Sequence, residues 1–595
     1  MRFLVVLALL VPTVSFAQSP ALWTATDVET TVVLDTPLLE ELGFLIDSET
    51  PSATPRTFDL MPFEVTSRVM AFTAPRPYSI AFTAPGNTFG SLVGSDLTHS
   101  GGFILRHQGD TIDARNFRIH QTEVADRLQL LDANGVVLFD LDHAHSALDL
   151  DAGRLMLFNV DMRIAAPLAE RLNRPELTGV SIGAIGLDAT LDTTAPEPLT
   201  RGGCSTPNFD LITDVALTDV SNLQQSHRDG GRVALTPSAT LENVGTADVK
   251  WYEFFTPSDD QHPYLVWALY RLDDGVFEMI GQSAVKHAFY TINSGCSCPG
   301  GHILWAVGCR DTYGTGTNSS RSWLAPRDEI TASTGEWARC GSYWDQDCNG
   351  EQDNRNPIDG FDRRMVVEES DLQDADARYF VEAWYIIQND VDIFNTMGWR
   401  EVDPTFTSSW SFPTLTDPMP LGPAINAWVP DDATLGANGA LNRTLTVGDE
   451  GHVQLVVETT DLGGGLTRYQ YGLMNHDFDR QIDSFSIPLP NGATVSNVTF
   501  GDIDQDGGND WSFAEGANAL TWTAPAGNSL DWGTLFVFGF TVDSAPVDSS
   551  ADLGVLEPGT PGVLTIGTLA PTTAGPIFTD GFESGDTVSW SATIN

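Results

Sequence analysis

Short stretches in which apolar and polar residues alternate, bounded by glycine, asparagine and aspartate, run through most of this chain. Clear examples are RVALTPSATL (232–241), HVQLVVET (452–459) and TLFVFGF (534–540). A period of two residues is typical of β-strands, and 54 glycines and 34 prolines suit many tight turns between them. Helical periodicity is convincing only in AAPLAERLNRPEL (165–177), which Pro175 ends. The sequence therefore predicts an all-β fold, with several β-sandwich-like domains in tandem and little helix.

The first residues have the pattern of an export signal. Arg2 precedes an apolar run at 3–11, and Ser15 and Ala17 supply the small residues that a signal peptidase reads. The apolar run is too short to span a bilayer, which needs about 20 apolar residues. No later stretch is apolar enough for a membrane helix. We therefore expect residues 1–17 to be a cleaved signal peptide and the mature protein to be exported, with no transmembrane segment.

Stretches rich in proline and glycine divide the rest of the chain into domains. These linkers are predicted at 193–203, 412–423 and 556–576. The predicted parts are a signal peptide (1–17), an N-terminal β-domain (18–200), a disulfide-braced central β-domain (204–405), an immunoglobulin-like β-sandwich (424–556), and a linker with a C-terminal tail motif (557–595).

The charge of the chain excludes several kinds of partner. Thirty basic residues stand against eighty acidic ones, which gives a formal net charge of −50. A surface of this sign repels nucleic acid and anionic lipid, so neither is an expected partner. Two other interpretations remain open together: solubility in a salty environment, and affinity for divalent cations.

All six cysteines fall within one segment of the chain. They are Cys204, Cys296, Cys298, Cys309, Cys340 and Cys348. An even number of cysteines in an exported protein favours three disulfides over a thiolate metal site. Cys296 and Cys298 are too close to pair with each other, whereas Cys340 and Cys348 flank a loop and are the best local pair.

Two loops carry carboxylates on every second residue around a glycine, in DQDCNGEQD (345–353) and GDIDQDGGND (501–510). Ca²⁺ takes six to eight oxygen ligands, and a tight loop of this spacing can curl them around one ion. The predicted ligands are Asp345, Asp347, Asn349 and Asp353 in one loop, and Asp502, Asp504, Asp506 and Asp510 in the other. The alternative is a pair of ordinary Asp-Gly turns.

The frame shared by the two loops resembles the first nine positions of EF-hand and thrombospondin-type calcium loops. It departs from the EF-hand at position twelve, where Asn356 and Phe513 stand in place of a bidentate glutamate. The resemblance therefore implies structural Ca²⁺ rather than an opening sensor.

Candidate catalytic residues lie in the central domain. They are His262, His287 and Asp311, which are close in sequence to cysteines and carboxylates. The alternative is that these histidines are hydrogen-bonded core residues. Strand alternation places Lys286 and His287 on opposite faces, so we do not expect them to share a site. In the N-terminal domain, His143 and His145 share a strand face, but no third metal ligand is identifiable beside them.

Several segments resemble known protein families. The stretches HPYLVWALYRLDDGVFEMIGQSAVKHAFYTI (262–292), SRSWLAPRDEI (320–330) and SFSIPLPNGATVSNVTFGDID (484–504) resemble a group of secreted bacterial proteins with no assigned function, over about 204–556. The terminal IFTDGFESGDTVSWS resembles a short sorting motif of exported Gram-negative proteins. These resemblances imply a protein that is secreted or held on the outer surface of a Gram-negative bacterium.

A fainter resemblance concerns the central domain. The order of segments at 232–249, 268–292, 311–316 and 379–387 is similar to that of bacterial lysyl-oxidase-like domains. Those domains are copper amine oxidases on a β-sandwich-like core. Their copper site is an H-x-H-x-H run, but here that place reads QHPYLVW and retains only His262. A shared fold does not by itself transfer the activity.

Two functions of different classes follow from these patterns. The first is a secreted or surface-displayed, calcium-stabilised β-protein with a binding or adhesion role toward an extracellular ligand, either protein or carbohydrate. The second is an extracellular enzyme, distantly lysyl-oxidase-like or metal-dependent, with its site in the central domain. A convergent His/Asp/Glu pocket would favour the enzyme, and a flat aromatic surface with Ca²⁺ in both loops would favour the binding protein.

Overall fold

The fold was analysed in a computed structural model of the chain. The structure describes residues 22–54, 67–75, 79–84, 89–94, 96–124, 127–149, 152–192, 209, 212–251, 262–288, 290–296, 304–350, 353, 359–431 and 439–571. The predicted signal peptide and the terminal motif lie outside these residues. Within them, no helix has the length and apolar character needed to cross a membrane.

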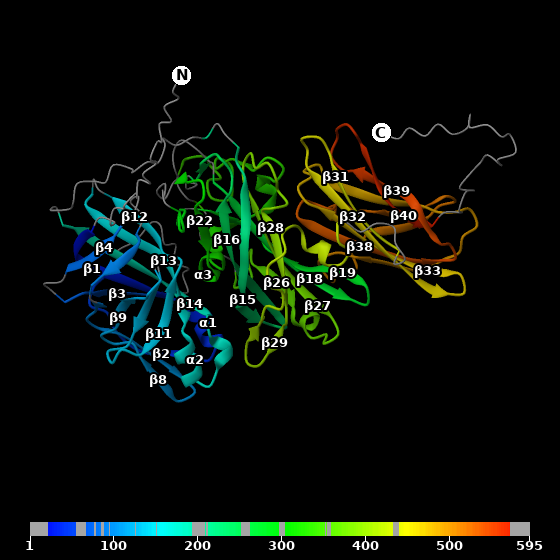
Figure 1. The fold of residues 1–595 in the computed structure, drawn as a ribbon. Coiled ribbons are helices and arrows are strands. Elements are labelled where there is room, and N and C mark those ends of the chain that lie inside the picture. Colours follow the sequence, from blue (N-terminus) through cyan, green and yellow to red (C-terminus); the bar gives the residue numbers. More distant parts are fainter. Residues whose placement is uncertain are drawn as a thin grey trace, which may run out of the picture.

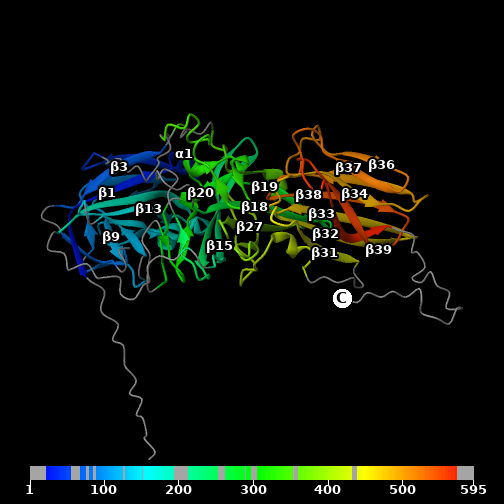
Figure 2. The same cartoon turned by 90° about the horizontal axis from the view of Figure 1, so that it is seen from above.

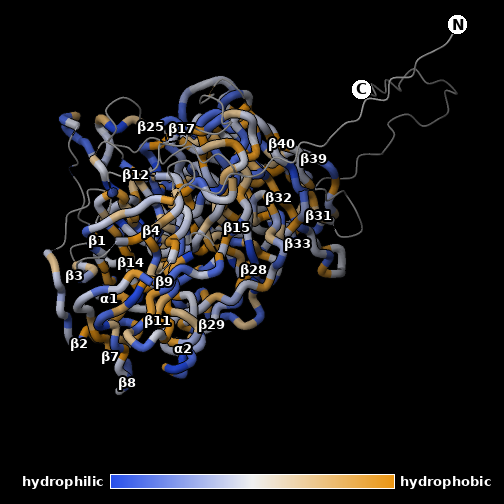
Figure 3. Tube along the Cα trace, turned by 60° about the vertical axis from the view of Figure 1, so that its left-hand side comes forward, coloured by the Kyte–Doolittle hydropathy of each residue, from blue (hydrophilic) through white to orange (hydrophobic). Residues whose placement is uncertain are grey.

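The described chain folds into antiparallel sheets arranged as three bodies in a row (Figures 1 and 2). Its short α-helices are α1 (Thr36–Glu41), α2 (Ala166–Arg171) and α3 (Thr315–Asn318), and its 3₁₀ turns are η2 (Pro175–Leu177), η3 (Arg321–Trp323), η4 (Arg327–Glu329), η5 (Glu369–Leu372) and η6 (Ala424–Ala427). The prediction of an all-β fold with little helix is confirmed. Alternation of hydrophobic and hydrophilic residues is visible along many strands (Figure 3).

The N-terminal domain contains one large antiparallel sheet and one small one. Its strands are β1 (Leu22–Leu34), β2 (Phe44–Thr50), β3 (Arg68–Thr73), β4 (Ser79–Thr83), β5 (Ser91–Val93), β6 (Leu97–Thr98), β7 (Gly102–His107), β8 (Asp110–Asp113), β9 (Arg118–Gln121), β10 (Leu128–Leu131), β11 (Val137–Asp142), β12 (His145–Asp149), β13 (Arg154–Ile164) and β14 (Ser181–Leu191). The eleven-stranded sheet follows the order β5-β4-β1-β14-β13-β11-β10-β9-β6, with β12 on β13 and β3 on β1, and β2-β7-β8 form the second sheet. The core of the domain fills the space between these sheets, α1 and α2.

The helical pattern predicted at 165–177 becomes α2 followed by the turn η2, so the helix ends four residues before Pro175. The sequence pattern did not reveal α1. Asp35 caps that helix by accepting a hydrogen bond from the backbone N–H of Leu38, and Pro37 lies in its first turn, where its missing N–H costs nothing.

The central domain is a sandwich of two six-stranded sheets. Its strands are β15 (Val215–Asp229), β16 (Arg232–Asn243), β17 (Val249–Lys250), β18 (Tyr264–Asp273), β19 (Val276–Gln282), β20 (Val285–His287), β21 (Leu304–Trp305), β22 (Arg310–Tyr313), β23 (Leu324–Ala325), β24 (Ile330–Thr331), β25 (Glu336–Trp337), β26 (Met365–Glu368), β27 (Arg378–Ile386), β28 (Met397–Val402), β29 (Thr405–Phe406) and β30 (Trp410–Ser411). One sheet has the order β22-β16-β15-β30-β29 with β26 on β16, and the other β23-β20-β18-β27-β28 with β19 on β18. Fully buried Trp251, Trp267, Trp305 and Trp344 are among its largest core residues.

The third domain packs two five-stranded sheets face to face. Its strands are β31 (Ala440–Thr446), β32 (His452–Gly463), β33 (Leu466–Asn475), β34 (Ile482–Pro488), β35 (Val495–Gly501), β36 (Ser512–Glu515), β37 (Ala519–Thr523), β38 (Thr534–Val542), β39 (Pro546–Val555) and β40 (Val563–Pro571). The sheet orders are β31-β32-β33-β38-β35 and β36-β37-β34-β39-β40. Both contribute to one aromatic-rich core.

Two of the predicted linkers are part of the folded body. The segment predicted as linker and tail from 557 contains β40, which pairs with β39 over nine residues, so the domain extends to Pro571. Pro558 and Pro561 lie in the turn before β40, and Leu564 and Ile566 of this strand are buried in the core. The segment 412–423 is likewise docked on β28, where Thr414 and Leu421 each form a β-bridge.

The domains contact each other through polar and apolar groups. Gln224 of β15 exchanges two hydrogen bonds with the backbone of Ser181 in β14, at 2.8 and 2.9 Å. On the other side, residues of β18, β19 and β27 share an apolar cluster with η6 and with the third domain. The described domains therefore form one continuous row.

Candidate functional site

The β18–β20 pairing brings two of the predicted catalytic residues together. His262 lies two residues before the start of β18, and His287 ends β20, where its register partner is Tyr264 of β18. The His262 Nε2 and His287 Nδ1 atoms lie 2.9 Å apart, and both side chains are buried. Twenty-five residues separate them in sequence, so only strand pairing explains their contact.

Aromatic rings surround this histidine pair. The ring centroids of Trp344 and Trp337 lie 4.4 and 4.9 Å from that of His287, and Trp337 also contacts His262 at 5.3 Å. Burial lowers the pKa of His262 to about 3 and places the pKa of His287 well below its usual value. Both imidazoles are therefore neutral at physiological pH.

Lys286, next to His287, is the most unusual side chain of the central domain. It is 1% exposed, and its Nζ donates a hydrogen bond to the His287 carbonyl oxygen at 2.8 Å. The same Nζ lies 4.4 Å from the centroid of the Tyr313 ring and 5.7 Å from that of Trp323. Burial lowers the pKa of Lys286 well below its ordinary value, although the charge of Asp311 opposes this shift.

Lys286 and His287 alternate along β20, as the sequence indicates, and have different neighbours. Both faces of this short strand are buried. The expectation that the two side chains do not share a site stays a prediction, and the interior region around Lys286 lies on the face of β20 opposite to the histidine pair.

Asp311 supplies a carboxyl group to the same interior region. It lies within β22, is fully buried, and accepts a hydrogen bond from the Ile292 backbone N–H at 2.5 Å. Burial raises the pKa of Asp311 to about 7, while hydrogen bonds and the Lys286 charge oppose the rise. Asp311 is thus electrostatically coupled to Lys286. Among the described residues, it does not form a group of three potential metal ligands with the histidine pair.

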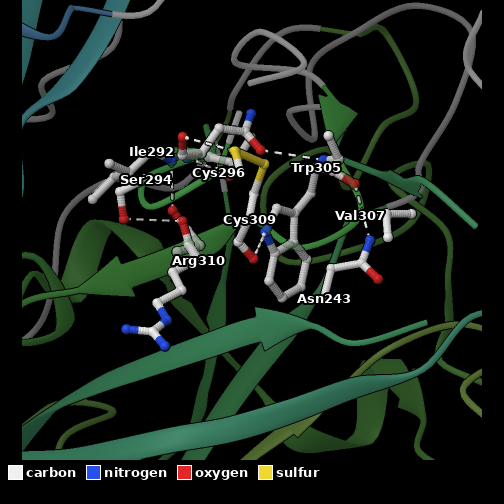
Figure 4. The surroundings of a disulfide bond; sticks show 12 residues. Asn243, Ile292, Ser294, Cys296, Trp305, Val307, Cys309 and Arg310 are labelled. Atoms are coloured by element: carbon white, nitrogen blue, oxygen red, sulfur yellow. Dashed lines mark hydrogen bonds between the residues drawn. A yellow bond between two sulfur atoms is a disulfide. The ribbon is translucent and has the colours of Figure 1, made fainter. Parts of the chain in front are cut away.

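A disulfide fixes the start of β22. Cys296 and Cys309 are joined, and Arg310 and Ser294 exchange backbone hydrogen bonds of 2.8 Å beside the bridge (Figure 4). The Trp305 indole N–H donates to the Cys309 carbonyl at 3.0 Å, so the bridge is also tied to a buried ring. Asp311 therefore sits two residues from a cross-linked, hydrogen-bonded anchor.

The second described disulfide joins Cys340 and Cys348, as the spacing predicted. Cys296 pairs with Cys309, which agrees with the expectation that it would not pair with Cys298. Cys204 and Cys298 lie outside the described residues. No free cysteine occurs among the residues that the structure describes.

The N-terminal domain contributes a third histidine to this region. His145 is fully buried at the start of β12, 5.3 Å from Tyr313 between ring centroids. Burial lowers its pKa to about 3, and the charge of Lys286 contributes in the same direction. His143 has a different environment, because its Nδ1 lies 2.9 Å from an oxygen of buried Asp161. The two histidines thus serve separate contacts.

The first acidic loop gathers three of its predicted ligands. One carboxylate oxygen each from Asp345, Asp347 and Asp353 lies within 4.8 Å of the others. Asp345 is buried, accepts from the Gly350 N–H at 3.1 Å, and contacts Arg339 at 3.3 Å. The side-chain amide of the predicted ligand Asn349 donates to Asp347 at 3.1 Å.

The second acidic loop is arranged differently. Asp502, Asp504 and Asp506 each accept a hydrogen bond from the backbone N–H two residues ahead, at 2.7–3.2 Å. Asp502 also accepts from Asn528 at 2.7 Å, and burial raises its pKa. Within the described chain, no three carboxylates of this loop, Asp510 included, converge as those of the first loop do. Calcium at 502–510 therefore remains a prediction from sequence.

Sequence reasoning missed Lys286 as a candidate, although the sequence contains a sign of it. Only Lys250 and Lys286 among the thirty basic residues are lysines, and the remainder are arginines. A chain that otherwise uses arginine nevertheless places one of its two lysines in the core. The contact of Tyr313 with Lys286 and with His145 could not be predicted from the sequence, because these three residues lie on strands of two different domains.

No protein-family model and no curated protein matches this chain.

Proposed function

We propose that this chain is an exported enzyme whose reacting group is the amine of Lys286 in the central domain, with Asp311 as its proton donor. The observation that carries the proposal is the position of Lys286 Nζ, fully buried and 4.4 Å from the Tyr313 ring centroid. A buried lysine that is electrostatically coupled to a buried carboxyl group favours an enzyme over a binding protein.

The physical argument concerns the protonation state of the lysine. Taking an ammonium group out of water is costly, and a deeply buried lysine responds by losing its proton. A neutral amine is a nucleophile, and desolvated lysines are used for covalent chemistry with carbonyl compounds. An apolar residue at position 286 would fill the same space at lower cost, so a role in chemistry accounts for the lysine.

The reaction class follows from the groups present. The neutral amine adds to the carbonyl carbon of an aldehyde and forms a carbinolamine. The carbinolamine hydroxyl then leaves as water with a proton from Asp311, while the nitrogen lone pair forms the C=N bond of a protonated imine, which leaves Asp311 as a carboxylate. No oxidant enters this step.

Reductive trapping tests the proposed reacting amine. Full-length exported protein is incubated with glycolaldehyde and cyanoborohydride at pH 7, and modified peptides are identified by mass spectrometry. Because the chain has only two lysines, assignment is direct. We expect a stable alkyl group on Lys286 and none on the corresponding peptide of Lys286→Arg. Modification of Lys250 alone in the folded wild-type protein would contradict the proposal.

The binding or adhesion role has less support from the surface. In the described part of the chain, the large hydrophobic side chains that are most exposed include only two aromatic rings, Phe209 and Phe406. Many of the tryptophans are core residues. An extracellular protein or carbohydrate ligand therefore remains a prediction from the sequence alone.

We also propose that Ca²⁺ stabilises the loop at 345–353. The convergence of three carboxylates favours this, since Ca²⁺ binds through oxygen ligands and Arg339, 3.3 Å from Asp345, balances only one of the three negative charges. Trp344, adjacent to the loop, is in contact with His287. An ion there would stabilise one wall of the histidine pair.

Chelation and one substitution test the calcium site. If Ca²⁺ binds only the folded protein, it adds about 2.7 kcal/mol at a hundredfold excess over Kd. EDTA should therefore lower the melting temperature of the full-length protein, and Asp347→Ala should remove most of this dependence. Asp417→Ala, at a side chain that is 92% exposed, is the matched control and should leave the EDTA effect intact. Identical melting curves with Ca²⁺ and with EDTA would show that the loop is an ordinary turn.

A further inference from the structure

A cavity of about 80 Å³ lies between the N-terminal and central domains. One wall comes from β1 and β14, and the other from the α3–η3 segment of the central domain. We call it the interdomain cavity, and its polar lining includes Asn159, Ser181, Thr317, Ser319 and Ser320. Its charged lining residues, Asp35 and Arg364, have opposite signs. A water molecule needs about 10–15 Å³ of such space, so the cavity has room for a ligand of several heavy atoms.

The two walls are held at close range. Gly314 and Gly316 of the α3 segment face Asp161, and a Cβ added to either would come within 1.5 and 2.6 Å of its carboxylate oxygens. The side-chain amide of Gln224 also joins the two domains, through its two hydrogen bonds with the Ser181 backbone. The two glycines thus permit the close contact between α3 and Asp161, and this contact lies beside the interdomain cavity.

Trp323 is the residue that links the interdomain cavity to Lys286. It lines the cavity, and its ring centroid lies 5.7 Å from Lys286 Nζ. On the far side of this centre, His145 and Phe158 of the N-terminal domain pack on Tyr313 and Tyr290, at 5.3 and 5.2 Å. Residues of both domains therefore surround Lys286. The interdomain cavity lies close to its amine, because Trp323 contacts both.

We propose that the interdomain cavity is the substrate site, and that it takes a small uncharged hydroxy-aldehyde whose carbonyl end passes the Trp323 edge to reach Lys286. This inference rests on the proposed role of Lys286. The lining hydroxyl and amide groups suit hydroxyls of the ligand. The Oγ of Ser320 is buried and has no hydrogen-bond partner among the described residues, so it is free to bind a ligand hydroxyl. The N-terminal domain is then half of the substrate site.

Filling and opening the cavity test this placement. The probe is glycolaldehyde with cyanoborohydride on the full-length protein, and the measurement is the rate of Lys286 modification relative to Lys250. Ala184→Leu, on the N-terminal wall, should slow Lys286 modification by about tenfold, because the added methyl groups occupy the cavity. Ala152→Leu, the same change at an exposed turn, should have no effect. Trp323→Ala should speed Lys286 modification.

The outcomes separate the two proposals. Absence of Lys286 modification in the wild-type protein overturns the reacting amine. Modification of Lys286 at the same rate in the wild type, Ala184→Leu and Trp323→Ala overturns the cavity as substrate site and leaves the amine intact. Because Lys250 reports on the same molecules, an unchanged Lys250 rate and unchanged far-UV circular dichroism show that each variant is folded.

Discussion

Asp311→Asn should slow the trapping of an aldehyde at Lys286 by roughly 10²-fold, the usual contribution of a positioned general acid. The carboxyl of Asp311 has a pKa of about 7 and is coupled to the Lys286 amine. It is protonated below that value, so the wild-type rate should fall as the pH rises through 7. An asparagine does not titrate, and the variant should lose this pH dependence. Stopped-time trapping between pH 5 and 9 measures both effects.

Asp390→Asn is the matched control for this experiment. Burial raises the pKa of Asp390 to about 7 as well, but its carboxylate accepts a hydrogen bond from Val215 at 3.1 Å and is not part of the Lys286 surroundings. This variant should keep the trapping rate and its fall near pH 7. If Asp311→Asn retained the wild-type pH profile, Asp311 would be a structural residue and another group would donate the proton.

Glu382→Gln should make the protein more stable at alkaline pH. Glu382 is buried where the central domain meets η6, accepts from the Tyr270 hydroxyl at 3.2 Å and from the Ala424 N–H, and has a pKa raised to about 7 by burial. An unfolded glutamate ionises near its ordinary pKa of about 4.3. The wild-type folded state therefore loses stability as the pH rises from about 4.3 to about 7.

The size of this effect follows from the difference between the two pKa values. A gap of 2.5 units or so corresponds to roughly 3 kcal/mol, which is fully lost above pH 7. Glutamine is neutral throughout, so the free energy of unfolding of the variant relative to wild type should rise by this amount between pH 4.5 and 8. Urea unfolding at the two pH values measures it. Exposed Glu336→Gln should show no such trend, and equal behaviour of both variants would contradict the assignment.

The strand pattern was readable from the sequence because it is local. Alternation such as that in 452–459 and 534–540 lies within β32 and β38, where successive side chains point to opposite faces. The same rule would have found β40, but the prolines and glycines around 558–562 suggested a linker instead. Those residues form only the turn between two paired strands. Local composition therefore suggested a domain boundary before β40, whereas the pairing of β40 with β39 places this strand inside the domain.

The candidate site shows the same division between local and long-range information. The residue types and the Cys340–Cys348 pair were predictable, since a short loop limits which cysteines can meet. His262 and His287 were named individually, but their contact depends on the pairing of β18 with β20. The two acidic loops share one spacing in the sequence, but among the described residues only the loop at 345–353 brings three carboxylates together.

The sequence by itself determined that this is an acidic all-β chain with a disulfide-braced centre, because alternation, charge and cysteine spacing are properties of neighbouring residues. Only the tertiary structure decided that Lys286 lies over Tyr313, that Asp311 is close enough to feel its charge, and that His145 of another domain completes the enclosure. Burial and proximity arise when distant strands pack together, and they set the protonation states on which chemistry depends. No single stretch of the chain contains that information.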